Sequence, residues 1–138
     1  MKLLSHLREL DEALKDWKRY QNISIEELKK DRDKRNMVLH AMLVSVQASI
    51  DIATYIIADK EFKKPSTCRE TFEILANEEV ISRELADKLA DLAGFRNILV
   101  HIYWGLDIDE VYSILRKDLG TLETFKKVAK ELLGEAKI

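Results

Sequence analysis

The segment from Arg35 to about Ala58 constrains the fold of this chain more than any other. Its apolar residues recur at helical spacing and occupy most sides of the predicted helix, rather than one stripe. A helix that is apolar on most sides must be covered by other elements, because a large exposed apolar surface is unfavourable in water. We therefore expect a central, buried helix with the rest of the chain packed around it.

The composition predicts that the surrounding elements are also helices. The chain has 138 residues, of which 46% are hydrophobic and 35% charged, with only four Gly and one Pro. Helices need few turn residues and tolerate long charged faces, and no segment shows a sustained alternation typical of a strand. We predict one all-α domain over residues 1–138, an antiparallel bundle of about five to six helices that dimerises through the helix described below.

Capping residues mark where these helices begin. The first helix is expected from about Leu3 to Tyr20. Hydroxyl or carboxyl side chains that can accept a bond from the N–H groups of the first turn precede most of the others. These caps are Ser24 with Glu27, Thr67 with Glu70, Ser82, and Asp107 with Glu110. The charged segment after Ser24 is expected to run to about Lys34, and Gly120-Thr121 is predicted to break the chain before the last helix.

Charge and cysteine content exclude several classes of protein. The net charge is −2, so the overall charge does not indicate nucleic-acid binding, and any contact with RNA must come from a local patch. The single Cys68 excludes an intramolecular disulfide and fits a reducing compartment. The N-terminus lacks a signal-peptide core, and no run approaches the roughly 20 apolar residues of a membrane span. We expect a soluble cytoplasmic protein without a membrane segment.

The segment from Arg96 to Tyr103, here called the motif, concentrates the chemistry of the chain. It places Arg96, Asn97, His101 and Tyr103 among apolar neighbours near the end of a predicted helix that Ser82 begins. At 100° per residue, Arg96 and His101 diverge by about 140°, whereas Asn97 and His101 share a face. One helix does not easily close a site around both residues, but two packed copies can. A stripe of small residues leading to Asn97 predicts a contact groove, and we expect a homodimer whose site lies at the subunit interface.

The residue types of the motif suit cleavage of a phosphodiester. Arg96 stays charged and must find a carboxylate, carbonyls or a phosphate. His101 titrates near neutrality and suits acid–base catalysis, and no set of His, Cys or carboxylates has metal-ligand spacing. This combination matches RNA cleavage without a metal or cofactor. The alternative is that Arg96 is a structural ion-pair partner, His101 a structural histidine and Tyr103 part of the core.

A polar stripe on the central helix is a secondary candidate. It consists of His40, Gln47, Asp51 and Thr54. In the functional interpretation, Asp51 pairs with Arg96, or the stripe lines the cleft beside it. In the other interpretation, it is a partly exposed face.

The residues Arg96-Asn97-x-x-x-His101-x-Tyr103 resemble the R-x4-H-x-Y signature of HEPN-domain toxins, in particular the HepT-like ribonuclease family. The resemblance extends over most of the chain, through residues 47–53, 68–75 and 111–115. Together with the length and the helical layout, it is much more specific than an isolated R-x4-H.

The resemblance implies a type VII-like toxin–antitoxin module. It implies a homodimer that cleaves RNA, tRNA among its substrates, with Arg96 and His101 as the catalytic pair and Asn97 as a supporting polar residue. It also implies an MntA-like nucleotidyltransferase antitoxin as partner, which silences the toxin by adding AMP to Tyr103. Bulk and negative charge on that phenol would exclude the phosphate of RNA.

Two other functions remain open at the level of sequence. The chain can be a non-catalytic subunit in which Arg96 binds a nucleotide or phosphate and docks substrate to a partner nucleotidyltransferase. It can also be a purely structural dimerisation bundle. The Arg96/His101 pair favours the nuclease, because docking alone does not need the histidine.

Overall fold

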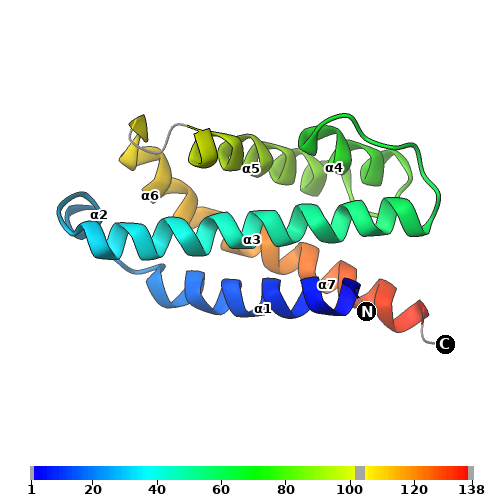
Figure 1. Ribbon diagram of the computed structural model, residues 1–138, viewed down its shortest axis with the longest axis horizontal. Coiled ribbons are helices and arrows are strands. Elements are labelled where there is room, and N and C mark those ends of the chain that lie inside the picture. Colours follow the sequence, from blue (N-terminus) through cyan, green and yellow to red (C-terminus); the bar gives the residue numbers. More distant parts are fainter. Residues whose placement is uncertain (1, 102–104, 137–138) are drawn as a thin grey trace.

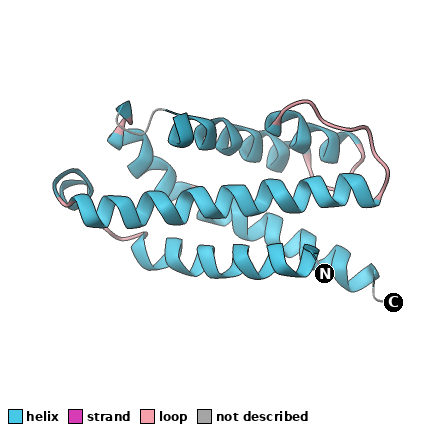
Figure 2. Ribbon diagram, in the orientation of Figure 1, coloured by secondary structure: helices cyan, strands magenta, loops and turns pink. Residues whose placement is uncertain are grey.

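The fold was analysed in a computed structural model, which describes residues 2–101 and 105–136 and the side chains of residues 3–100 and 105–134. Over these ranges the chain forms seven helices, more than the five to six expected, and no strand (Figure 2). The predicted all-α class is confirmed. The helices are α1 (Lys2–Tyr20), α2 (Ile25–Lys30), α3 (Arg32–Asp59), α4 (Cys68–Asn77), α5 (Arg83–His101), α6 (Ile108–Lys117) and α7 (Leu119–Ala136).

The long helix α3 is the axis of the bundle, as its sequence predicts. It packs against α1, α2, α4, α5 and α7 (Figure 1). Its buried residues lie on several sides of the helix, and one hydrophobic cluster joins them to buried residues of the other helices. Figure 1 shows that α3 and α5 run in opposite directions, which sets the relative position of residues on the two helices used below.

The predicted caps are confirmed at the helix starts. The hydroxyl of Thr67 accepts a hydrogen bond from the backbone N–H of Glu70 at 3.0 Å. Ser24, Ser82 and Asp107 accept equivalent bonds from the first turns of α2, α5 and α6. Each bond satisfies an N–H group that has no partner within its own helix.

Two boundaries differ from the sequence prediction. The charged segment does not run on to Lys34, because Asp31 both ends α2 and caps α3, accepting from the Lys34 N–H at 3.1 Å. The break before the last helix lies at Asp118 rather than at Gly120-Thr121. Asp118 donates its N–H to the carbonyl of Ile114 at 2.9 Å, so α6 ends there and Gly120 falls in the first turn of α7.

Helices α3 and α4 end on glutamates with a left-handed backbone. The φ angles are 55° at Glu61 and 61° at Glu79. Beyond Glu61, the N–H of Phe62 donates to the carbonyl of Ile57 at 2.9 Å, and Val80 makes the corresponding bond after α4. This is the Schellman pattern of helix termination, in which glycine is the usual left-handed residue.

Helix α3 is also the one described helix long and apolar enough to cross a membrane. Its most apolar window has a mean hydropathy of 1.6, which departs from the sequence expectation, but 61% of that window is buried inside the bundle. Its burial against five other helices accounts for the apolar character without a membrane.

A buried tryptophan connects the first and sixth helices. Trp17 is fully buried, and its indole N–H donates to the carbonyl of Leu115 at 2.9 Å. This bond joins residues far apart in the sequence and holds the end of α6 against α1. A buried polar pair of this kind is costly to break because the remaining partner stays out of reach of water.

We expect Trp17→Phe to lower the free energy of unfolding by about 1–3 kcal/mol, because it removes both the donor and part of the packed ring system. Urea denaturation followed by far-UV circular dichroism measures this change. Tyr20→Phe is the matched control, since Tyr20 lies one turn further along α1 and is only partly buried. A loss below about 0.5 kcal/mol for Trp17→Phe would contradict the role of this bond.

Candidate functional site

Helix α5 carries the motif and is held on two sides within the chain. Its Leu residues face the common core, and the small residues Ala86, Ala90 and Ala93 are at most 1% exposed. Helix α4 packs along α5. The small-residue stripe is thus a contact groove, as predicted, but these three alanines are buried inside the chain rather than free for a second copy.

The glycine of this stripe does not mark a close backbone approach. A Cβ atom built on Gly94 would lie 3.9 Å from the nearest side-chain atom, Nη2 of Arg69, which is an ordinary van der Waals distance. Among the described residues, no close packing requires glycine at this position.

Arg96 is half-buried and its charge is not balanced within the described residues. Nη1 donates to Oδ1 of the neighbouring Asn97 at 3.0 Å, whereas Nε is buried and has no hydrogen-bond partner. No described carboxylate forms an ion pair with Arg96. The structure therefore gives no support to the alternative of a structural ion pair. A buried guanidinium donor without a partner favours an anion that binds from outside the chain.

The other two chemical groups of the motif lie outside the described residues. Helix α5 ends at His101, whose side chain is not described, and Tyr103 lies between the two described ranges. Their roles therefore rest on the sequence.

Asp51 does not pair with Arg96, so this part of the sequence interpretation is wrong. Its carboxylate accepts from Nε2 of Gln47 at 2.9 Å and lies 4.0 Å from Nδ1 of His6 on α1. These partners place it at the contact between α3 and α1, whereas the guanidinium of Arg96 is hydrogen-bonded to Asn97. Helical spacing showed which residues share a face of α3, but not which neighbouring helix covers each turn.

The first residue of the polar stripe, His40, lies beside the motif helix. His40 lines a cavity of about 220 Å³ with Asn36, Leu39 and Leu43 of α3 and Leu99 of α5. Asn36 is not among the candidates expected from the sequence, although it lies one helical turn before His40, because it follows a run of charges that resembles a solvated surface.

Three large apolar side chains are exposed at the same end of the bundle. They are Met37 on α3, 46% exposed, and Ile98 and Val100 on α5, 39% and 45% exposed. Ile98 and Val100 are two residues apart on α5 and therefore point to nearly opposite sides of the helix, so the three side chains do not form one patch.

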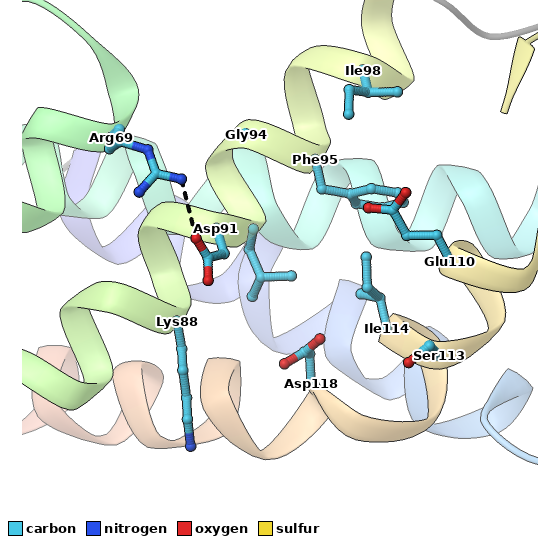
Figure 3. Close-up of a pocket in the computed structure, with 11 residues that line it drawn as sticks. Arg69, Lys88, Asp91, Gly94, Phe95, Ile98, Glu110, Ser113, Ile114 and Asp118 are labelled. Atoms are coloured by element: carbon cyan, nitrogen blue, oxygen red, sulfur yellow. Dashed lines mark hydrogen bonds and ion pairs between the residues drawn. The ribbon is translucent and has the colours of Figure 1, made fainter. Parts of the chain in front are cut away.

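A larger cavity, of about 520 Å³, lies between α5 and α6 and is shown in Figure 3. Arg69 and Asp91 form an ion pair at its rim, with 3.1 Å between Nη2 and Oδ1, and Asp118 points into it. Burial raises the pKa of the Asp118 carboxyl, and the negative charge of Asp91 raises it further, while Lys88 and Lys117 oppose the shift. Ile98 and Gly94 line this cavity, so it lies on another side of α5 from Arg96.

The described part of the chain has no cluster of side chains that could bind a metal ion. No group of three or more His, Cys, Asp or Glu side chains there is arranged to hold an ion. The guanidinium of Arg96 is the described cationic group that has a buried donor without a partner.

Comparison with known proteins gives a consistent result. Residues 10–129 match the family described as ribonuclease HepT-like. The chain is 32% identical over 104 residues to the mRNA nuclease HepT of Shewanella oneidensis, covering 75% of this chain and 78% of that one. It is 30% identical over 95 residues to the tRNA nuclease HepT of Aphanizomenon flos-aquae, covering 69% of this chain and 65% of that one.

A solved structure extends the similarity to the fold. The chain superimposes with a TM-score of 0.85 and 26% identity on the tri-AMPylated HEPN toxin of Shewanella oneidensis in complex with MNT antitoxin, over 94% of this chain and 96% of that one. Family match, sequence identity and fold therefore agree with the resemblance carried by the motif, and the chain belongs to the ribonuclease HepT-like family of HEPN proteins.

Proposed function

We propose that the chain is the ribonuclease toxin of a HEPN/nucleotidyltransferase toxin–antitoxin module and acts in the cytoplasm. The observation that carries the proposal is the unbalanced guanidinium of Arg96, with a buried Nε that has no partner in the described residues. Two curated relatives named as nucleases, one of mRNA and one of tRNA, support the class of activity. RNA is the substrate class, and tRNA is the first candidate within it.

The chemistry follows from the charges that develop during cleavage. The 2′-oxygen attacks the adjacent phosphorus, the P–O5′ bond breaks, and the products are a 2′,3′-cyclic phosphate and a free 5′-hydroxyl. Arg96 stabilises the negative charge that builds up on the phosphate oxygens. His101 accepts the proton of the 2′-hydroxyl or donates one to the leaving 5′-oxygen. In a symmetric dimer, two His101 side chains can divide these roles. Asn97 orients the guanidinium of Arg96, from which it accepts a hydrogen bond.

We expect purified protein with unmodified Tyr103 to cleave total tRNA in EDTA. Arg96→Ala should lower the rate about 10²–10³-fold and His101→Ala about 10²–10⁴-fold, because each removes a group that acts in the transition state. Gel electrophoresis of the RNA measures cleavage. Thr124→Ala is a control, since Thr124 is an exposed residue on α7 and belongs to none of the candidate site residues.

No cleavage by the wild type, once mass spectrometry shows Tyr103 free of AMP, would favour the alternative function. In that alternative, Arg96 binds a phosphate and the chain is a non-catalytic docking subunit for a nucleotidyltransferase. The same unbalanced guanidinium supports it, but it leaves His101 without a role. A neighbouring nucleotidyltransferase reading frame would exclude the third function, a purely structural bundle.

The active form is expected to be a homodimer at micromolar concentration. Val100 lies within the motif and is exposed, and Val100→Lys places a charge where two copies of α5 are proposed to meet. This variant should shift the dimer towards monomer and lower cleavage in parallel, as measured by light scattering and the tRNA assay. Thr124→Lys adds the same charge at an exposed position of α7 and should do neither. A monomeric wild type that still cleaves would overturn the shared site.

Adenylylation of Tyr103 is expected to inactivate the toxin. The phenol oxygen would attack the α-phosphorus of ATP, release pyrophosphate and leave AMP on the side chain. The solved relative is named as a tri-AMPylated toxin in complex with an MNT antitoxin, which supports this mode of control. With a partner nucleotidyltransferase and ATP, mass spectrometry should detect AMP on wild type and not on Tyr103→Phe. A modified protein that cleaves tRNA at the unmodified rate would contradict the inhibition.

A further inference from the structure

The 220 Å³ cavity between α3 and α5 lies next to the unbalanced guanidinium. Leu99, which lines it, is three residues beyond Arg96 on α5. These positions lie on neighbouring turns of one helix face, and a full turn rises about 5.4 Å. A phosphate held by Arg96 would therefore have this cavity within the reach of the sugar and base attached to it.

The walls of the cavity suit a flat ring with polar edges. Leu39, Leu43 and Leu99 provide apolar surface, and His40 provides an exposed imidazole. Among the described residues, His40 has no hydrogen bond or ion pair, whereas Asn36 already makes another interaction. The volume is below the roughly 300–1,000 Å³ of sites that enclose a whole drug-sized ligand, so it fits one ring system. Histidine stacks on the unpaired bases of RNA.

Cations lie towards both ends of the cavity. Arg32 precedes Asn36 by one turn of α3, is exposed, and has no ion pair within the described residues. Because α3 and α5 run in opposite directions, Arg96 lies towards the Leu43 end and Arg32 towards the Asn36 end (Figure 1). A nucleotide within a chain has a phosphate on each side of its base, and this arrangement offers a guanidinium to each.

From these observations we propose that the cavity is a subsite for one unpaired nucleobase, next to the phosphate bound by Arg96, with His40 as its recognition residue. The proposal deepens the proposed function and rests on it for the identity of the ligand as RNA. It makes base selection a property of α3, separate from the chemistry of the motif. A cleaved RNA should then show a preference for the base next to the cut.

Binding of small probes tests the subsite without cleavage. The probes are the four ribonucleoside 5′-monophosphates and ribose 5-phosphate, which has the phosphate and sugar but no base. By calorimetric titration of the dimer, wild type should bind at least one nucleotide about tenfold more tightly than ribose 5-phosphate. Arg96→Ala should weaken the binding of the nucleotides and of ribose 5-phosphate alike, because it removes the phosphate contact that they share.

Three variants separate the base contact from other effects. Leu43→Trp fills the cavity, and His40→Ala removes the ring, so both should abolish the difference between nucleotide and ribose 5-phosphate. His40→Phe should restore it if stacking supplies the contact. Thr124→Ala, at an exposed position of α7, should leave it unchanged. In the tRNA assay, His40→Ala should raise KM about tenfold and leave kcat within about twofold.

Equal affinity of wild type for every nucleotide and for ribose 5-phosphate would overturn the subsite, and cleavage of tRNA by that same protein would leave the proposed function standing. Selective nucleotide binding by a protein that does not cleave RNA would support the subsite and overturn the proposed function. If Leu43→Trp and His40→Ala act only by dissociating the dimer, which light scattering would show, the cavity is an interface between copies and the proposal is wrong.

Discussion

The burial of α3 is the constraint on which the rest of the structure depends. Because this helix is apolar on most sides, it is stable only when other helices cover it, and α1, α2, α4, α5 and α7 do so. The polar stripe on its less covered side meets different neighbours along its length. Gln47 and Asp51 are hydrogen-bonded to each other, with Asp51 close to His6 of α1, whereas His40 lines the cavity beside the motif helix. One helix therefore contributes both to packing against α1 and to that cavity.

Most of the fold could be predicted from the sequence because its signals are local. A cap such as Thr67 needs only the N–H groups of the next turn, and the structure has it where the sequence places it. The end of α3 at Asp59 likewise agrees with the expected end at about Ala58, but the left-handed backbone at Glu61 and Glu79 has no such signal, since glycine is the usual residue there. Asp31 was missed for a related reason. Its carboxylate caps α3 inside a run of charges, where sequence alone does not show a break.

The candidate site was less predictable because it depends on contacts between helices. The requirement that Arg96 find an anion follows from its chemistry, but the absence of one within the described residues is a property of the fold. Periodicity grouped Asp51 with His40, whereas the direction of each side chain depends on which helix lies opposite that turn. The small-residue stripe shows the same limit. A groove is recognisable in the sequence, but the sequence does not show whether α4 or a second copy fills it.

The two left-handed glutamates have a practical consequence for work on this protein. A residue with a Cβ in that conformation costs roughly 1–2 kcal/mol more than glycine does. Glutamate at the termini of α3 and α4 therefore makes the fold less stable than glycine would at the same two positions. Both termini lie at the end of the bundle opposite the C-terminal end of α5 (Figure 1). Glycine at these two positions would give a more robust scaffold in which disruptive changes around Arg96 can be studied without loss of the fold.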